Sequence, residues 1–277
     1  MRVSLDAVVR ELLVRCLESW APGALHAKRA TVACAAPAEA EAVVRALADL
    51  GPRGRRLSLV LFSGERHDAG DLQVFTVSGA VETYLPAALT AAGAAGAPVF
   101  AFLDGAPVHA VLRAVASGRP SELMFTAGAG DWAAQRDALR GTGFALTAGV
   151  ELVDAAGAAR LVGFGTGHLK RLEAFKAELW AVDEYAGVRY RDPGDPDGHL
   201  LDISLRPHPG PLRRELLAHL RTVEWRTVAE LKQFALTETV YRAEDCAAAL
   251  TTLLASGAVE RTPERGRLAG DVLIRAS

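Results

Sequence analysis

The stretch Pro98–Leu103 (PVFAFL) is the segment that most clearly predicts the fold. An apolar run without alternation is typical of a strand that is buried on both faces of a parallel sheet. Leu57–Phe62 (LSLVLF) has the same character, and Glu122–Thr126 (ELMFT) follows later in the chain. Helical segments separate these strands, which recur about every 25 residues. This rhythm predicts a parallel sheet covered by helices on both faces, which is a Rossmann-like α/β architecture.

The alternation of strands and helices does not continue before or after this region. An amphipathic helix opens the chain and is expected to stop at Pro22-Gly23. Phe144–Val153 and Ala158–Gly165 predict an antiparallel hairpin at the end of the sheet. A helix follows, and then Tyr185–Gly198, rich in proline, glycine and aspartate, is expected to be a linker or exposed loop. We therefore assign residues 1–205 to one α/β domain.

The last part of the chain, residues 206–277, predicts a separate small domain. Its expected elements are three helices and two strands: Pro211–Thr222, Thr227–Leu236, Arg242–Ser256, Ala258–Thr262 and Asp271–Arg275. Three helices followed by a two-stranded wing predict a winged-helix domain.

Composition excludes several classes of protein. The chain has 277 residues, with 31 basic and 33 acidic side chains and a formal net charge of −2, which excludes a disordered chain and a globally basic nucleic-acid coat. Cys16, Cys34 and Cys246 are far apart and form no C-x-x-C pair, so we expect buried thiols in a reducing compartment. No segment is long and apolar enough to span a bilayer, and no signal peptide is recognised. We expect a cytoplasmic protein without membrane contact.

Three segments carry a resemblance to a known bacterial family. Leu161–Asp183 (LVGFGTGHLKRLEAFKAELWAVD) contains an F-G-T-x-H strand end and then K-x-x-x-W-x-V-D. Val228–Glu260 contains T-E-T before an aromatic residue and a long helix, and Pro98–Val108 is a central strand ending in aspartate. In these features the chain resembles the three-Cys-motif partner proteins. The resemblance implies a methyltransferase-type fold, a C-terminal winged helix, and a partner protein with a three-cysteine motif.

The family's cofactor elements are altered in this chain. After the first strand, the resemblance implies a glycine-rich loop beneath S-adenosylmethionine (SAM), because the backbone there must approach the ligand closely. The corresponding stretch, Val32–Val43, contains no glycine, and only Pro37 matches the family. The acid expected after the second strand is displaced to Glu65, whereas Asp104 is kept at the end of Pro98–Asp104. We expect no cofactor, with SAM as the alternative, held by Asp104, Glu65 and the backbone of Ala35 and Pro37.

Other candidate sites are weaker. Gly163–Gly167 lacks the spacing of a phosphate-binding loop and predicts a strand-to-helix turn. The seven histidines form no metal-binding pattern, so no metal is expected. The linker acids are expected to be solvated rather than to bind calcium, and they are Asp192, Asp195, Asp197 and Asp202. The wing offers Arg261, Arg265 and Arg267 to phosphates, but the third helix begins with Glu244 and Asp245, which disfavours reading of the major groove.

Three functions remain open at this point. The first is a non-catalytic binding or scaffold protein, which the missing glycine loop favours. The second is an active SAM-dependent methyltransferase acting on nucleic acid or protein. The third is a DNA-associated regulator that uses the winged helix. No catalytic residue is assigned, and the missing loop leaves open whether the chain is an enzyme.

Overall fold

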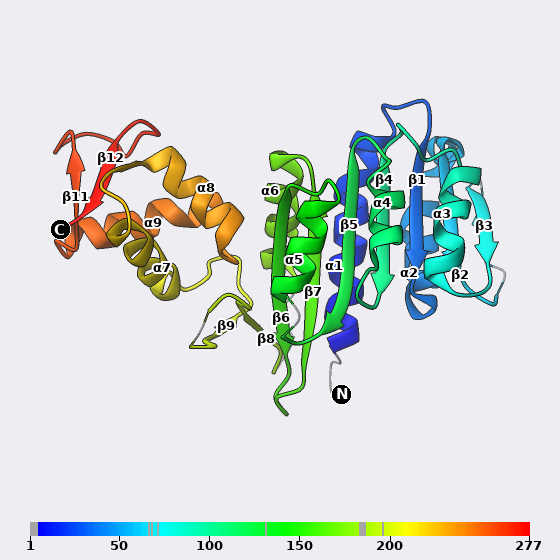
Figure 1. Cartoon of the computed structure of the whole chain (residues 1–277), viewed down its shortest axis with the longest axis horizontal. Coiled ribbons are helices and arrows are strands. Elements are labelled where there is room, and N and C mark those ends of the chain that lie inside the picture. The colour runs from blue at the N-terminus through cyan, green and yellow to red at the C-terminus, as the bar shows by residue number, and fades with distance from the viewer. Residues whose placement is uncertain are drawn as a thin grey trace.

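The computed structural model describes residues 5–65, 67, 69–70, 72–130, 132–182, 187–195 and 197–277, without the side chains of 51–53. Within these residues the chain forms one large sheet with flanking helices and a smaller C-terminal unit (Figure 1). In this part of the chain, no helix is long and apolar enough to cross a membrane.

The large sheet follows the predicted rhythm. Its strands are β1 (Ala30–Ala35), β2 (Leu57–Phe62), β3 (Gln73–Val77), β4 (Val99–Asp104), β5 (Ser121–Gly128), β6 (Leu146–Val153), β7 (Ala159–Thr166), β8 (Arg189–Arg191) and β9 (Leu200–Asp202). Their order is β3-β2-β1-β4-β5-β7-β6-β8-β9. Strands β1 to β5 pair in parallel, and β7 runs antiparallel between β5 and β6. The expectation of a mostly parallel α/β sheet is confirmed.

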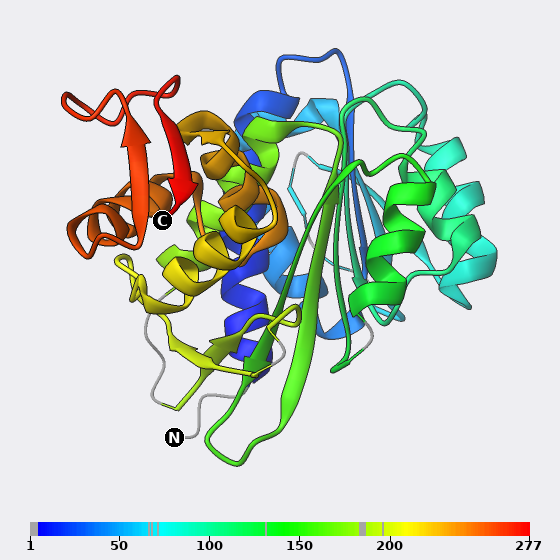
Figure 2. The same ribbon diagram turned by 60° about the vertical axis from the view of Figure 1, so that its left-hand side comes forward.

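Helices cover both faces of this sheet. They are α1 (Leu5–Ala24), α2 (Ala40–Ala48), α3 (Val81–Ala91), α4 (His109–Val115), α5 (Trp132–Gly141) and α6 (Leu169–Ala181), with short 3-10 helices η1 (Pro37–Glu39) and η2 (Gly51–Arg56). Helices α1, α2 and α6 pack on one face, and α3, α4 and α5 pack on the other (Figure 2). Each face therefore has its own apolar core, as expected for a sheet that is buried on both sides.

The predicted stop of the first helix is wrong by a few residues. Helix α1 continues through Pro22 to Ala24. A proline has no backbone N–H and so removes one hydrogen bond of the helix. Near the end of the helix only this one bond is lost, and the helix continues for two more residues. The N–H of Leu25 still donates to the carbonyl of Ala21 at 3.0 Å.

The hairpin of β6 and β7 forms as predicted, but it does not end the sheet. Strands β8 and β9 lie beyond β6, within the segment expected to be a linker and just after it. The Arg191 guanidinium lies 2.6 Å from the buried Glu151 carboxylate, and the buried Tyr190 hydroxyl donates to the Leu179 carbonyl at 2.7 Å. These long-range contacts order a stretch whose local composition favours a loop. Tyr185 lies outside the described residues.

Gly163 and Gly165 lie inside β7 rather than in a turn. A Cβ atom on Gly163 would stand 2.2 Å from Cζ of Phe125, and one on Gly165 would stand 3.0 Å from Phe144. These glycines therefore make room for aromatic rings packed against the sheet. The predicted strand-to-helix turn over Gly163–Gly167 is therefore wrong for Gly163 and Gly165.

The C-terminal unit, residues 206–277, has three helices and a small sheet. They are α7 (Gly210–Arg221), α8 (Val228–Glu238), α9 (Ala243–Ala255), β10 (Arg226–Thr227), β11 (Val259–Thr262) and β12 (Leu273–Ala276). The small sheet is antiparallel in the order β10-β12-β11. A capping box begins α8, since Thr227 Oγ1 accepts from the Glu230 N–H at 3.1 Å and the Glu230 carboxylate accepts from the Thr227 N–H at 2.7 Å. Apolar residues of this unit continue the core of α1, α2 and α6.

Candidate functional site

The sheet reverses its strand order between β1 and β4, and this is the point where open α/β sheets bind ligands. A cavity of about 160 Å³ lies at the carboxyl ends of these two strands. Ala35 from β1 and Asp104 from β4 both line it, so the structure brings together two of the four residues predicted for a cofactor. Its other walls come from the residues after β4 and the start of α3. Small-molecule sites usually enclose roughly 300–1,000 Å³, so this switch-point cavity is small for a cofactor.

Asp104 is held in place by its neighbour on β5. The Thr126 hydroxyl is buried and donates to Oδ1 of Asp104 at 2.6 Å. The carboxylate itself is exposed at the mouth of the cavity. Gly105 follows with φ of +128°, a conformation that lets the chain turn away from the strand end. Asp104 is thus a fixed acceptor that remains open to a ligand.

The segment after β1 is closed by its own side chains. Pro37 begins η1, and Ala35 and Ala36 are buried. The Glu39 carboxylate is also buried, and the Arg10 guanidinium of α1 holds it through a 2.7 Å contact to Oε2. This ion pair raises the pKa of Arg10, through the hydrogen bond to Glu39 and its charge. The turn that would carry a glycine loop is therefore a packed and paired 3-10 helix.

Glu65 is not among the residues that line the switch-point cavity. It is exposed after β2, and its backbone N–H donates to Oγ of Ser63 at 3.1 Å. Oγ of Ser63 also lies 3.1 Å from Nε2 of His67. The cavity lining therefore includes neither Glu65 nor Pro37.

The three cysteines are free and buried, as predicted. The Cys34 thiol, near the end of β1, donates to the Ala36 carbonyl at 3.5 Å. Burial raises the pKa of Cys34 and of Cys246 to about 12, so neither is a reactive thiolate at neutral pH.

A second region of interest is the contact between α6 and the C-terminal unit, which we name the seam. The Lys176 amine, buried in α6, donates to three backbone carbonyls: Ala235 at 3.2 Å, Thr239 at 2.5 Å and Tyr241 at 2.8 Å. All three hydrogens of an ammonium group are thereby used. Burial lowers the pKa of Lys176 to about 7, although Asp192 and other nearby carboxylates act to raise it.

Three further contacts complete the seam. The Trp180 indole N–H donates to the Val240 carbonyl at 3.1 Å, and the Asp192 carboxylate accepts from the Val240 N–H at 2.9 Å. The Trp180 ring stacks on Tyr241 at 5.8 Å between ring centroids. Two of the three segments that carry the family resemblance, those with K-x-x-x-W and T-E-T, therefore meet in space. They hold the end of α8 and the following turn against α6.

An acidic cavity of about 450 Å³ lies beside the seam, between residues 192–195, α7 and α8. Its lining includes four carboxylates, Asp192, Asp195, Glu215 and Glu238, next to the stacked rings of His219 and Phe234. Burial, reinforced by the charges of Asp192 and Asp195, raises the pKa of Glu215 to about 8.

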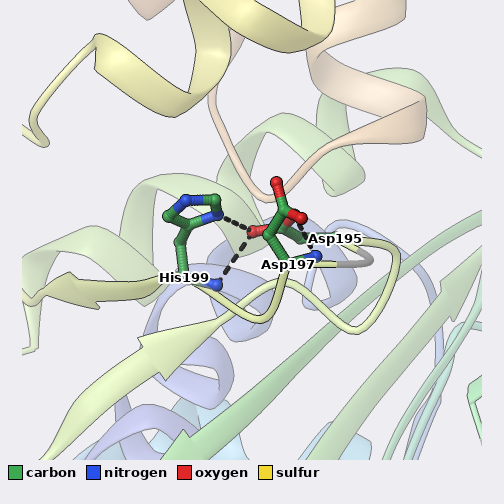
Figure 3. A group of neighbouring side chains, drawn as sticks. All are labelled: Asp195, Asp197 and His199. Atoms are coloured by element: carbon green, nitrogen blue, oxygen red, sulfur yellow. Dashed lines mark hydrogen bonds and ion pairs between the residues drawn. The ribbon is translucent and has the colours of Figure 1, made fainter.

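Two of the linker acids, Asp195 and Asp197, lie close to His199 (Figure 3). Ligand atoms of Asp195, Asp197 and His199 all lie within 4.8 Å of one another. Oδ2 of Asp195 lies 2.6 Å from Nδ1 of His199 and 2.9 Å from its backbone N, while Oδ1 accepts from the Asp197 N–H at 3.0 Å. Burial acts to raise the pKa of Asp195, but these hydrogen bonds outweigh it and lower the pKa. The cluster explains how the loop is stabilised, and the expectation that it binds no metal stays a prediction.

The three arginines predicted to touch phosphates lie in or next to the loop between β11 and β12. The Arg261 guanidinium donates to the carbonyls of Pro263 and Gly266 at 2.8 and 3.0 Å, so it shapes this loop. Arg265 and Arg267 are exposed. The exposed face of α9 offers no lysine or arginine, and Arg242 before it is paired with Glu244 and Asp245.

The seam residues were missed as a site, although the sequence contains a signal. Leu172, Phe175, Leu179 and Trp180 form the apolar face of α6 with helical spacing, and Lys176 falls on that same face. A lysine at a core position must find hydrogen-bond acceptors. What the pattern does not show is that the acceptors lie some 60 residues later, in the last turn of α8 and in the backbone just after it.

Comparisons with known proteins give little further information. No family model matches the chain, and no curated protein matches it. Among solved structures, a DUF519 protein of Legionella pneumophila matches with a TM-score of 0.42 and 9% identity over 66% of this chain and 94% of that one. EvdMO1 matches with a TM-score of 0.39 and 18% identity over 59% of this chain and 42% of that one. These similarities are too weak to support conclusions about function, and the resemblance to three-Cys-motif partner proteins stays a prediction.

Proposed function

We propose that this chain is a non-catalytic binding or scaffold protein, built on a methyltransferase-type α/β fold, that works with a partner protein. The observation that carries the proposal is the small size of the switch-point cavity, about 160 Å³. In place of a glycine loop, β1 is followed by η1, whose buried Glu39 is paired with Arg10. A ligand with an adenosine and a methionine portion needs backbone that can be approached closely and a larger cavity than this one.

The arrangement of the C-terminal unit supports the second part of the proposal. Three helices and an antiparallel sheet in the order β10-β12-β11 are compatible with a winged helix. Because the exposed face of α9 carries acids, alanines and threonines, a protein partner suits this unit better than the major groove of DNA. A three-cysteine-motif protein is the partner that the family resemblance implies.

Calorimetric titration of the full chain with SAM, and with its demethylated product, tests the proposal. We expect no binding heat at about 1 mM ligand, where even a weak site would respond. Micromolar affinity for either ligand would overturn the proposal. If the titration gives no heat, a thermal unfolding transition in the same sample shows that the protein was folded during the measurement.

An active SAM-dependent methyltransferase is the second candidate function. It is favoured by Asp104, an open carboxylate that lines the switch-point cavity together with Ala35. If SAM binds, Asp104→Ala should weaken that binding at least tenfold, because the ligand would lose the carboxylate that accepts its hydrogen bonds. Unchanged affinity in this variant would remove Asp104 from the assignment.

A DNA-associated regulator is the third candidate, supported by the exposed Arg265 and Arg267. Its test is the affinity for a DNA duplex at several salt concentrations, since phosphate contacts make affinity fall steeply with salt. Absence of binding at low salt would exclude this function.

A further inference from the structure

A cavity of about 580 Å³ lies between β9 and the start of α7, apart from the switch-point cavity. Its lining residues are His199, Leu200, Leu201, Asp202, Ile203, Ser204, Arg206, His208, Gly210, Pro211 and Arg214. Its volume falls within the range of small-molecule sites, roughly 300–1,000 Å³. One wall belongs to the large sheet and the other to the C-terminal unit.

Two arginines of this lining are available to a ligand. Among the described residues, neither the Arg206 nor the Arg214 guanidinium has a hydrogen-bond or ion-pair partner, and both side chains are exposed at the cavity. Several other arginines of the chain are engaged by carboxylates, for example Arg171 by Glu122 at 2.7 Å. One carboxylate, Asp202, also lines the cavity, so two guanidinium charges face a single acid.

Neutral donors accompany the two charges. Nδ1 of His208 accepts from the Gly210 N–H at 3.2 Å, which leaves Nε2 as the protonated nitrogen of a neutral ring. Oγ of Ser204 accepts from the Arg206 N–H at 3.1 Å, so its hydroxyl hydrogen is available for another acceptor. The cavity therefore presents donors of three chemical kinds and is suited to an oxyanion.

We propose that this cavity binds a small organic phosphate. Guanidinium groups match phosphate oxygens in geometry and charge, and they form shorter, stronger hydrogen bonds than neutral donors do. Leu200 and Pro211 add partly exposed apolar surface for the organic part of the ligand. The site is independent of the proposed scaffold role and of SAM.

The position of the cavity gives binding a structural consequence. Asp202 belongs to β9 of the large sheet, whereas Pro211 and Arg214 belong to α7 of the C-terminal unit. A ligand held by both walls binds the folded chain only, so it raises the unfolding temperature by mass action.

Titration of the full chain with inorganic pyrophosphate and with adenosine monophosphate tests the site. We expect saturable binding of these probes. The affinity should fall about tenfold in Arg206→Gln and in Arg214→Gln, because each variant loses a charge-assisted hydrogen bond to the phosphate. Arg221→Gln is the matched control, because Arg221 is exposed at the end of the same helix and lies outside the cavity lining. The control should bind like the parent chain.

Three results would overturn the proposal. The first is no binding of either probe at about 10 mM and low salt. The second is equal weakening by Arg221→Gln, which would indicate attraction by net charge alone. The third is an arginine-dependent affinity for a short DNA duplex without affinity for either probe, which would assign the cavity to a nucleic-acid backbone. Circular dichroism of each variant separates loss of binding from loss of folding, and none of these results depends on whether SAM binds.

Discussion

The switch point and the seam use polar residues in opposite ways. At the switch point, where this fold class binds ligands, the chain following β1 is closed by alanines and by the ion pair of Arg10 with Glu39. At the seam, a buried lysine, an indole N–H and an aspartate are all directed at the backbone of residues 235–241. Polar groups in the first region close the strand end, whereas those in the second join two parts of the chain.

The two regions also differ in how many hydrogen bonds their buried polar groups form. A buried charge is retained only where hydrogen bonds compensate its lost hydration, and Lys176 has three such bonds. Docking of the C-terminal unit is thus specified by hydrogen bonds as well as by apolar packing. Such a specification is compatible with the scaffold role proposed above.

Loss of the seam amine should have the largest effect on stability. Lys176→Met keeps the length of the side chain but removes the lysine donor from the carbonyls of Thr239 and Tyr241, while the Ala235 carbonyl keeps the Thr239 hydroxyl as a donor. We therefore expect the free energy of unfolding to fall by about 3 kcal/mol. Urea denaturation followed by circular dichroism measures this change. Lys170→Met, exposed at the start of α6, should change stability by less than about 0.5 kcal/mol. A loss for Lys176→Met as small as that of the control would mean that the seam rests on apolar packing alone.

Loss of the switch-point ion pair should have a smaller effect. Arg10→Met leaves the buried Glu39 carboxylate without its partner, but the Arg10 side chain is 46% exposed, so water screens part of the cost. We expect a loss of about 1–2 kcal/mol, with faster hydrogen exchange confined to residues 36–40. Arg45→Met, which breaks an exposed pair with Glu41 on the adjoining helix, is the control. Exchange that also increases at residues 235–241 would show that the two regions are coupled.

The smallest effect concerns the acidic cavity and depends on pH. The pKa of Glu215 is raised from 4.5 to about 8 in the folded chain, so the folded state binds more protons than the unfolded state between these values. The contribution of Glu215 to stability therefore falls as pH rises from 4.5 to 8. Glu215→Gln removes the ionisable group, so the variant should exceed the parent in stability above pH 8 and match it near pH 4.5.

The expected gain for Glu215→Gln is about 1 kcal/mol, because the carboxylate is partly exposed and solvent screening reduces the full effect. Thermal and urea unfolding at both pH values measure it. Glu224→Gln, exposed beyond α7, should show no such dependence on pH. A gain that is equal at the two pH values would contradict the raised pKa as its cause.

The local sequence pattern was sufficient to predict strands where the apolar residues form a long, regular run. The continuous apolar runs at Leu57–Phe62 and Pro98–Leu103 predicted β2 and β4 to within a residue, and the alternation with helices predicted a mostly parallel sheet. Strands β8 and β9 were not predicted, because each is three residues long and is ordered by distant partners such as Glu151. Short segments contain too little periodicity to outweigh proline and glycine in their surroundings.

The candidate sites divide in the same way. The missing glycine loop after β1 and the aspartate at the end of β4 are properties of the sequence, because they depend on residue type beside a recognisable strand. Three features were decided only by the tertiary structure: Glu65 does not line the cavity that Asp104 lines, Lys176 is buried against residues 235–241, and Arg206 and Arg214 meet at one cavity. The spacing of apolar residues indicates which face of a helix or strand is buried. It does not indicate which distant backbone and side-chain groups pack against that face.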